Sequence, residues 1–360
     1  MSVVQERHEK HGATYEKRGG RRVVAHYGRP ERAHQAVRNG VGVIEAAYGV
    51  VVVEGDDRVD YVDNAVSNRI PAEDGEGCYA LLLDPQGAIT TDMYVYNAGE
   101  RLLVFVPPGR AAPLAEEWSE KIFIEDVSVR VATDEFGIFG VHGPNATEKI
   151  ASVLNGAASP DRSRSFVRGT MRDAGVTVVR TDAPAGEESY EVVCVVEDAD
   201  AVFDALLNHG LNAAAFGHRT WETLTLEAGT PLFESELEGR IPNVVGVRSA
   251  LDFEKGCYVG QEVVSRIENR GHPNQRLVGL QVSSLPRPGA AVVDGDAAVG
   301  EVTRAAKSPT LDEPIALALV ETDHPDEVTV NVDGEPVEAA IVELPFVEGS
   351  ERSARIPAYP

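Results

Sequence analysis

Apolar and polar residues alternate through the first half of the chain in runs that predict β-strands with helices between them. Strand patterns cover residues 48–55, 78–84 and 88–108, and the sequences Asp-Pro-Gln-Gly and Asn-Ala-Gly-Glu interrupt them as hairpin turns do. Helical spacing of apolar residues begins at residue 31 and again covers residues 111–122. The pattern therefore predicts an α+β body.

The pattern changes near residue 275, where helical spacing stops and short strands with turn signals follow one another. This texture predicts a small all-β domain, either a barrel or a sandwich. We expect a polar N-terminal segment at residues 1–22, an α+β body of two lobes at 23–270 with the second lobe at roughly 50–135, and a β-barrel at 275–350. A chain of 360 residues has room for these parts.

The chain is strongly acidic, with 58 aspartates and glutamates, 33 lysines and arginines, and a formal net charge of −25. Such a surface stays hydrated in concentrated salt, where charge repulsion is screened within a few ångströms, so the composition predicts a halophilic protein. An ordinary acidic protein is the alternative. Nonspecific nucleic-acid binding is disfavoured because it needs basic patches.

The sequence carries no membrane or export signal. It has no run of about 18 apolar residues, and its polar beginning lacks the apolar centre of a secretory signal. We therefore expect a cytoplasmic protein with no membrane partner.

Three widely spaced cysteines are present, and no CxxC or Cys/His spacing predicts a metal site. Cys78 and Cys194 lie in apolar runs and are expected to be buried. Cys257 follows Lys255 in a glycine-rich stretch, where a cation and free backbone N–H groups would lower the pKa of a thiol. A reactive thiol and a purely structural turn are both open at this point.

The stretch Lys-Gly-Cys-Tyr-Val-Gly-Gln-Glu, residues 255–262, resembles the signature of the folate-binding YgfZ/GcvT family. Residues 25–45, 141–149, 223–243 and 301–320 also resemble segments of that family and of its aminomethyltransferase branch, the glycine cleavage T-protein. The resemblance implies a three-lobed α+β fold, in which two lobes surround a channel for tetrahydrofolate and a C-terminal β-barrel follows. Together with the acidic composition it suggests a haloarchaeal source.

The resemblance also implies site residues. Glu187 matches a pterin-gripping carboxylate, with Tyr190 and Glu191 beside it, and Tyr258 is a further candidate for contact with the folate. Asp92 stands where the aminomethyltransferase branch carries an acid doublet that orients the folate and handles a proton. Cys257 would be a reactive thiol helped by Lys255. The alternatives without a binding role are a solvated hairpin loop at Glu187 and a residue that ends a hairpin turn at Asp92.

The leading interpretation is a tetrahydrofolate-binding YgfZ-type protein that supports iron–sulfur enzymes, its expected partners. Three departures from the aminomethyltransferase branch favour it: Trp221-Glu222 replaces an Arg-Asp pair, Ala47-Tyr48 replaces Ser-His, and Val106 or Pro107 replaces an asparagine. The alternatives are an aminomethyltransferase that works with a lipoyl carrier protein, a folate-dependent demethylase, and a scaffold that does not bind folate.

Overall fold

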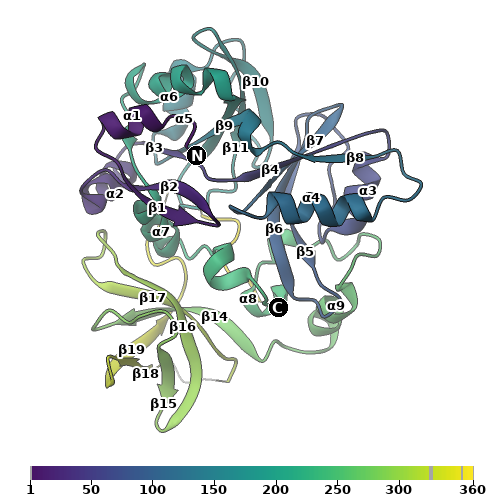
Figure 1. Cartoon of the computed structure of the whole chain (residues 1–360). Coiled ribbons are helices and arrows are strands. Elements are labelled where there is room, and N and C mark those ends of the chain that lie inside the picture. Colours follow the sequence, from purple (N-terminus) through teal and green to yellow (C-terminus); the bar gives the residue numbers. More distant parts are fainter. Residues whose placement is uncertain (1, 324–326, 350–351, 360) are drawn as a thin grey trace.

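The computed structural model of the chain describes residues 2–323, 327–349 and 352–359. They form two α+β lobes, each built on one mainly antiparallel sheet, and a closed barrel. Figure 1 shows the three lobes meeting at the centre, with the barrel below the other two.

The first lobe contains a six-stranded sheet in the order β10-β11-β12-β9-β3-β13. Its strands are β3 (Gly42–Glu45), β9 (Phe136–His142), β10 (Phe166–Met171), β11 (Ala174–Arg180), β12 (Ser189–Val195) and β13 (Ala214–Ala215). Helices α5 (Ala146–Val153) and α6 (Ala199–Asn208) pack against its outer face. Because side chains alternate along a strand, β12 places Tyr190 and Val192 on this outer face, and Glu191 and Val193 toward the centre of the molecule.

The second lobe is inserted between β3 and β9 and contains a five-stranded sheet in the order β5-β6-β7-β4-β8. Its elements are β4 (Gly49–Glu54), α3 (Arg58–Ala65), β5 (Gly77–Leu83), β6 (Ile89–Asn97), β7 (Arg101–Val106), α4 (Ala111–Glu120) and β8 (Ser128–Val131). Alternation divides β6 between two cores: Met93 and Val95 pack outward in the core that holds α3 and α4, whereas Tyr94 and Tyr96 face the centre.

The third lobe is the barrel, closed in the order β14-β17-β16-β15-β18-β19. Its strands are β14 (Gln275–Val282), β15 (Ala291–Asp294), β16 (Ala297–Lys307), β17 (Pro314–Glu321), β18 (Glu327–Val332) and β19 (Glu335–Val342). Small aliphatic side chains fill its interior, among them Val292, Val302 and Ala318. A full closure leaves the strands without an open edge.

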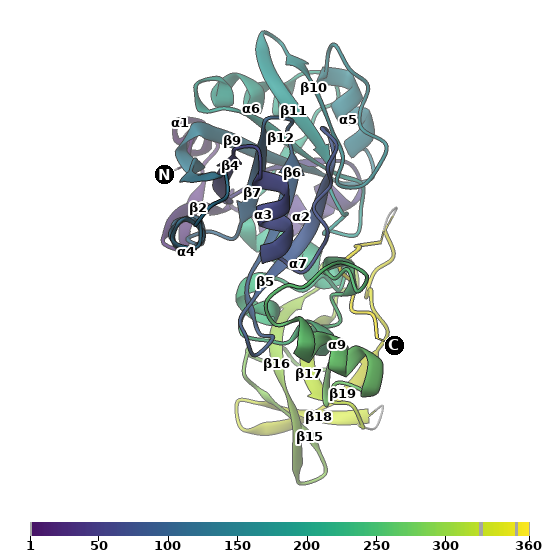
Figure 2. The same cartoon turned by 90° about the vertical axis from the view of Figure 1, so that its right-hand side faces the viewer.

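One hydrophobic core at the centre joins all three lobes. It contains Tyr79 of the second lobe, Val193 of the first and Leu317 of the barrel, each buried. Helix α9 (Gln261–Arg270) lies beside the lower end of β5 and above the barrel (Figure 2). The inner faces of the lobes therefore depend on one another for burial.

A buried polar cluster also ties the lobes together. Glu227, at the end of α7 (His218–Glu227), accepts hydrogen bonds from His34 at 2.8 Å and Arg38 at 3.0 Å, both on α2 (Pro30–Arg38). Ser308, just after β16, donates to the other Glu227 oxygen at 2.5 Å. Burial alone would raise the pKa of Glu227, but His34, Arg38 and Ser308 outweigh it and hold this pKa at about 2.

The first residues form α1 (Gln5–Lys10) and a hairpin of β1 (Thr14–Arg18) and β2 (Arg21–His26). Shorter helical elements complete the chain: η1 (Thr133–Glu135), η2 (Val196–Asp198), η3 (Phe233–Leu237), α8 (Pro242–Val245) and η4 (Arg248–Ala250).

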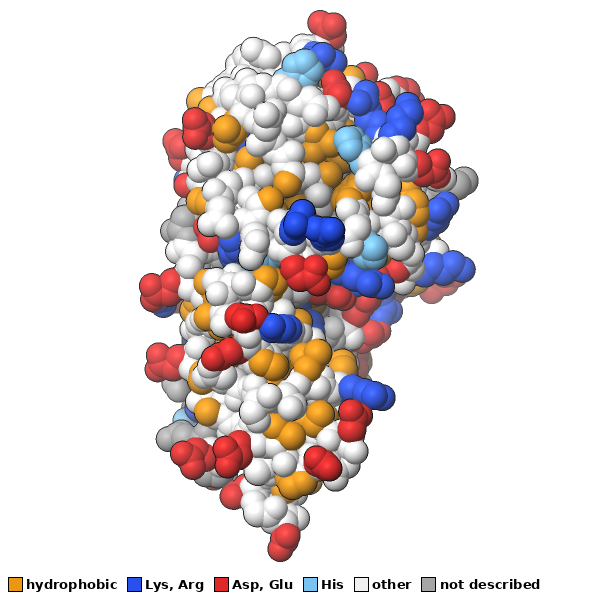
Figure 3. All heavy atoms as spheres, turned by 90° about the vertical axis from the view of Figure 1, so that its left-hand side faces the viewer, with side chains coloured by type: hydrophobic (Ala, Val, Ile, Leu, Met, Phe, Trp, Pro, Cys, Tyr) orange, Lys and Arg blue, Asp and Glu red, His pale blue; other side chains and the backbone are white. Residues whose placement is uncertain are grey.

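The observed architecture confirms the predicted α+β fold with a barrel after it. Helix α2 ends at Arg38, and Asn39 is its C-cap residue. Within the described ranges, no helix has the length and apolar character needed to cross a bilayer, and no group of three or more His, Cys, Asp and Glu side chains is placed to hold a metal ion. Acidic side chains are scattered over the face seen in Figure 3, from the body down to the barrel.

Candidate functional site

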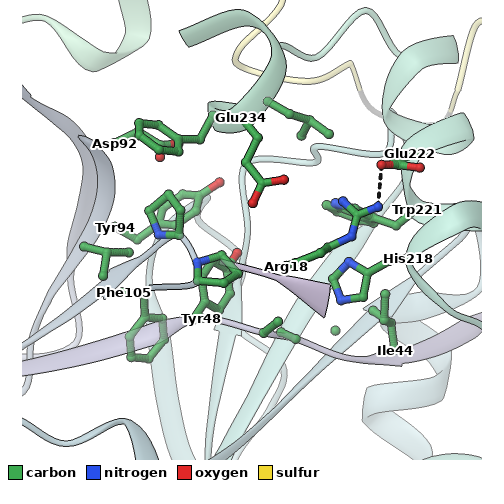
Figure 4. A pocket seen from close by; sticks show the side chains of 18 of the residues that line it. Arg18, Ile44, Tyr48, Asp92, Tyr94, Phe105, His218, Trp221, Glu222 and Glu234 are labelled. Carbon is green, nitrogen blue, oxygen red and sulfur yellow. Dashed lines mark hydrogen bonds and ion pairs between the residues drawn. The ribbon is translucent and has the colours of Figure 1, made fainter. Parts of the chain in front are cut away.

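A pocket lies between the inner faces of the two sheets, at the centre of the α+β body (Figure 4). Roughly 1040 Å³ around it is free of protein atoms, and this volume includes space that is open to solvent. Its aromatic lining is Tyr48, Tyr94, Phe105, Trp221 and Phe233, and its charged lining is Arg18, Asp92, Glu191, Glu222, Glu234 and Arg355.

Asp92 enters the pocket from β6. Its Oδ2 accepts a 2.8 Å hydrogen bond from the Tyr79 hydroxyl. Its Oδ1 is buried and has no hydrogen-bond partner among the residues that the structure describes. Burial raises the pKa of Asp92, and the nearby Arg355 guanidinium opposes that rise. A buried acceptor without a donor is costly, so Oδ1 is poised to receive an N–H or O–H from a ligand.

Glu191 enters from the opposite sheet, on β12, and has the same kind of arrangement. The Tyr48 hydroxyl donates to Oε1 at 2.7 Å, while the buried Oε2 finds no partner within the described part of the chain. Burial raises the pKa of Glu191 to about 7, although the Tyr48 hydrogen bond acts to lower it. This carboxyl can therefore both hold and release a proton near neutral pH.

A third tyrosine–carboxylate pair stands behind the first two. The Tyr94 hydroxyl donates to Asp182 Oδ1 at 2.7 Å. Arg355 lies between the acids, with Nη1 at 3.9 Å from Asp92 Oδ2 and Nε at 3.4 Å from Asp182 Oδ2. The pocket thus gathers acidic acceptors around one buried guanidinium.

The pocket mouth carries a second arginine. Arg18, at the end of β1, is hydrogen-bonded to the Glu222 carboxylate on α7, as the dashed line in Figure 4 marks, and to Glu16 at 2.7 Å. Glu234 points into the space between Asp92 and Arg18 (Figure 4). Burial lowers the pKa of the nearby His218 to about 3, so its imidazole is neutral at pH 7.

Of the residues named from sequence, Asp92 lines the pocket, whereas Glu187 and Tyr190 are not among its lining residues. Glu187 is buried and forms an ion pair with Arg38 at 3.4 Å. Tyr190 faces the outer helices, where its hydroxyl is 2.7 Å from Thr147 Oγ1. The alternation of β12 explains this, since Glu191 rather than Tyr190 points toward the centre.

Lys255, Cys257 and Tyr258 lie together just before α9, and none of them lines the described pocket. The Lys255 ammonium is buried and donates to the carbonyls of Asp63, Val66 and Asn68 at 2.5–2.9 Å, around the C-terminal end of α3. Tyr258 is buried in the central core. Cys257 is exposed.

Tyr48, Arg18 and Arg355 line the pocket but were not proposed from the sequence, which named Glu191 only as a neighbour of the main candidate Glu187. The strand pattern of residues 189–195 carried a usable signal for Glu191, because period two separates it from Tyr190. The two arginines had no comparable signal.

Two known family domains match this chain. Residues 4–255 match the GCVT N-terminal domain, and residues 275–348 match the glycine cleavage T-protein C-terminal barrel domain. The chain belongs to the GcvT family.

Relatives in this family match the chain over nearly its whole length. An aminomethyltransferase of Saccharopolyspora erythraea is 31% identical, over 96% of this chain and 97% of that protein. One of Listeria innocua is 30% identical, over 94% and 95%. The crystal structure of glycine cleavage system aminomethyltransferase T from Bartonella henselae superposes with a TM-score of 0.86, at 22% identity over 96% of this chain and 97% of that one, which shows a shared fold.

Proposed function

We propose that the central pocket binds tetrahydrofolate and that the protein transfers a one-carbon unit in the manner of an aminomethyltransferase. The observation that supports this most directly is the pair of buried, unpartnered acceptors in the described pocket, Asp92 Oδ1 and Glu191 Oε2. The family membership and the full-length aminomethyltransferase relatives support the choice of ligand.

The residues present fit a reduced pterin. Its ring edge carries N–H donors, which are the groups that an unpartnered carboxylate oxygen needs. Tyr48 and Phe105 stack with their centroids 5.6 Å apart, and Tyr94 stands edge-on to Tyr48 at 6.3 Å, so flat aromatic faces border the acids. This combination holds a flat, donor-rich ring by stacking and by charged hydrogen bonds.

Arg18 suits the other end of the ligand. The glutamyl part of a folate carries carboxylates, and a guanidinium can bind a carboxylate through two parallel, bidentate hydrogen bonds. Arg18 is already paired with Glu222 at the pocket mouth, so ligand binding would exchange one carboxylate partner for another. Glu222 therefore competes with the ligand for Arg18 and lowers the affinity for folate.

Tetrahydrofolate supplies two N–H groups, one in the pterin ring and one next to it, that would bind the methylene carbon, while the amine leaves as ammonia and the carrier sulfur leaves as a thiol. In that reaction Asp92 Oδ1 is placed to accept a proton from the pterin side of the pocket, with Tyr79 holding the other oxygen. Glu191, with a pKa of about 7, is placed to hold or release a second proton. The walls of Tyr48, Tyr94 and Phe105 limit the access of water.

A second candidate function rests on Cys257. It is the exposed cysteine among three, and an added Cβ at the neighbouring Gly256 would meet no atom within 4 Å. An open thiol of this kind suits the YgfZ-type role, in which the protein would bind folate and support iron–sulfur enzymes. Lys255 holds the base of this segment through its carbonyl contacts.

One experiment separates these functions. Purified protein in molar salt is titrated with tetrahydrofolate by calorimetry, then assayed for methylenetetrahydrofolate formation with an aminomethyl-loaded lipoyl carrier protein. Transfer that survives Cys257→Ser and is lost with Asp92→Asn supports the first proposal. Folate binding without transfer, with iron–sulfur enzyme activity falling in cells that carry Cys257→Ser, supports the second. Absence of any folate binding would remove both.

A further inference from the structure

Arg355 belongs to segment 352–359, which follows the barrel and lies beyond residue 348, where the matched barrel domain ends. The chain returns there to the centre of the molecule, beside α8 (Figure 1). Two backbone hydrogen bonds fix it: Ala354 N–H donates to the Asp182 carbonyl at 3.0 Å, and Ala358 N–H donates to the Gly246 carbonyl at 2.9 Å.

The far end of the segment is anchored on the barrel. The Tyr359 hydroxyl accepts a 2.7 Å hydrogen bond from Leu277 N–H and donates to the Val244 carbonyl at 2.9 Å. Gly246 is packed so closely that an added Cβ would lie 2.9 Å from both Ala358 N and the Tyr359 ring. The segment is therefore built into the fold and brings Arg355 to one position.

Arg355 itself is only 5% exposed. Besides its ion pairs with Asp92 and Asp182, its guanidinium lies 5.0 Å from the Tyr79 ring centroid and 5.8 Å from that of Tyr94. The titratable groups that face it are Tyr79 from β5, Asp92 and Tyr94 from β6, Asp182 from the β11–β12 connection, and Tyr48 and Glu191 somewhat farther away.

Two buried carboxylates near one another repel and take up protons unless a cation compensates them. A protonated Asp92 would offer a donor where the site needs an acceptor. The buried cation that contacts both Asp92 and Asp182 in the described structure is Arg355.

We propose that Arg355 is a positioning residue of the folate site, which holds the carboxylates of Asp92 and Asp182 in place so that Asp92 Oδ1 remains an acceptor for the ligand. The segment that follows the barrel is thus part of the binding site. This inference rests on the proposed function for the identity of the ligand.

The test uses the full chain with Arg355→Gln, Arg355→Lys and, as matched control from the same segment, Arg352→Gln, whose exposed side chain pairs with Glu348. Tetrahydrofolate affinity is measured by calorimetry across pH 6 to 9. Arg355→Gln is expected to bind tetrahydrofolate about tenfold or more weakly than wild type near pH 7. As the pH is lowered from 9, its affinity should begin to fall at a higher pH than that of wild type. Arg355→Lys should restore much of the affinity, and Arg352→Gln should match wild type.

Wild-type affinity and pH profile in Arg355→Gln would overturn the inference. Tighter binding in that variant would also overturn it, since the guanidinium would then occupy the place of the ligand. If Arg355→Gln does not fold, Asp182→Asn combined with Arg355→Gln removes the buried charge and its partner together, and the same loss of affinity is expected.

A measurement without ligand keeps the two proposals apart. Arg355→Gln should lose more stability at pH 8 than at pH 5, because burial raises the pKa of Asp92 and its unpaired carboxyl is more fully ionised at the higher pH. If wild type fails to bind folate but this difference is found, the proposed function fails and the ion-pairing role of Arg355 stands. An equal loss at both pH values would defeat that role.

Discussion

Tyr48 and Glu191 meet across the central pocket, where the tyrosine hydroxyl donates a 2.7 Å hydrogen bond to one carboxylate oxygen and leaves the other to the ligand. Tyr48 belongs to the connection between β3 and β4, and Glu191 to β12. The pair therefore links the two α+β lobes at the point where a ligand would bind.

The first prediction concerns this hydrogen bond. It lowers the pKa of Glu191, which burial has raised to about 7. Tyr48→Phe should therefore raise that pKa further, and the pH at which folate affinity rises to its plateau should move upward. Tyr61→Phe, whose hydroxyl bonds the Trp118 carbonyl elsewhere in the second lobe, is the control. Calorimetry from pH 6 to 9 checks it; coincident profiles for both variants and wild type would contradict the assignment.

The second prediction removes the acceptor charge. Glu191→Gln should weaken tetrahydrofolate binding about 10- to 100-fold, because a hydrogen bond to a charged group contributes about 1.5–3 kcal/mol. Glu197→Gln, on the exposed surface after the same strand, should leave the affinity unchanged. Equal affinities for the two variants would show that Glu191 does not contact the ligand.

The third prediction separates activity from stability at Asp92. The pKa of Asp92 is higher in the folded protein than in the unfolded chain. The folded state therefore binds more protons, and the contribution of Asp92 to stability is lost as pH rises through its folded pKa. Asp92→Asn should therefore melt at or above the wild-type temperature at pH 8, with a smaller difference at pH 4. It should also lose about 10²- to 10³-fold in transfer rate. A variant that is both less stable and fully active would refute the assignment.

The fourth prediction concerns the cluster around Glu227. Its folded pKa of about 2 lies below that of the unfolded chain, so its contribution to stability is present above about pH 4.5 and is lost as pH falls toward 2. Glu227→Gln should cost about 3–5 kcal/mol at pH 7, because His34 and Arg38 lose a buried partner.

Urea unfolding at pH 7 and pH 3 measures this cost. Glu238→Gln, which breaks an exposed ion pair with Arg110, should cost less than about 1 kcal/mol. Equal losses for Glu227→Gln and Glu238→Gln would show that the buried cluster adds no stability of its own.

The fifth prediction concerns the thiols. Burial raises the pKa of both Cys78 and Cys194 to about 12, whereas Cys257 is exposed. A short iodoacetamide pulse near neutral pH, followed by mass spectrometry, should label Cys257 alone. Comparable labelling of the three cysteines would argue against a special role for the 255–262 segment.

The composition could predict a chain rich in acidic residues, and strand alternation could predict which faces of the strands are buried. Period two along β6 separates Met93 from Asp92 and Tyr94, and the structure keeps that division. The same rule applied to β12 points Glu191 toward the pocket, whereas the motif gave the main role to Glu187 and named Tyr190 and Glu191 only as its neighbours.

Other parts of the site lay beyond sequence reasoning. Arg18 and Arg355 reach the pocket through packing between segments far apart in the chain, and no local pattern around either one specifies a partner. Lys255 shows a second limit of sequence reasoning. Its neighbour in sequence is Cys257, but its ammonium reaches across space to three carbonyls near α3, because a buried cation requires acceptors that only the folded chain supplies.

The central core, which draws on all three lobes, has a consequence for synthesis of the chain. Domains usually fold one after another as they emerge from the ribosome, but here the first two lobes cannot cover their inner faces until Leu277 and Leu317 of the barrel arrive. A nascent chain that stops before the barrel would lack the barrel residues of the core that Tyr79 and Phe105 share, so part of this core would be exposed to water. Such intermediates are aggregation-prone, so we expect a cell to depend on chaperones to shield the growing chain until the barrel emerges.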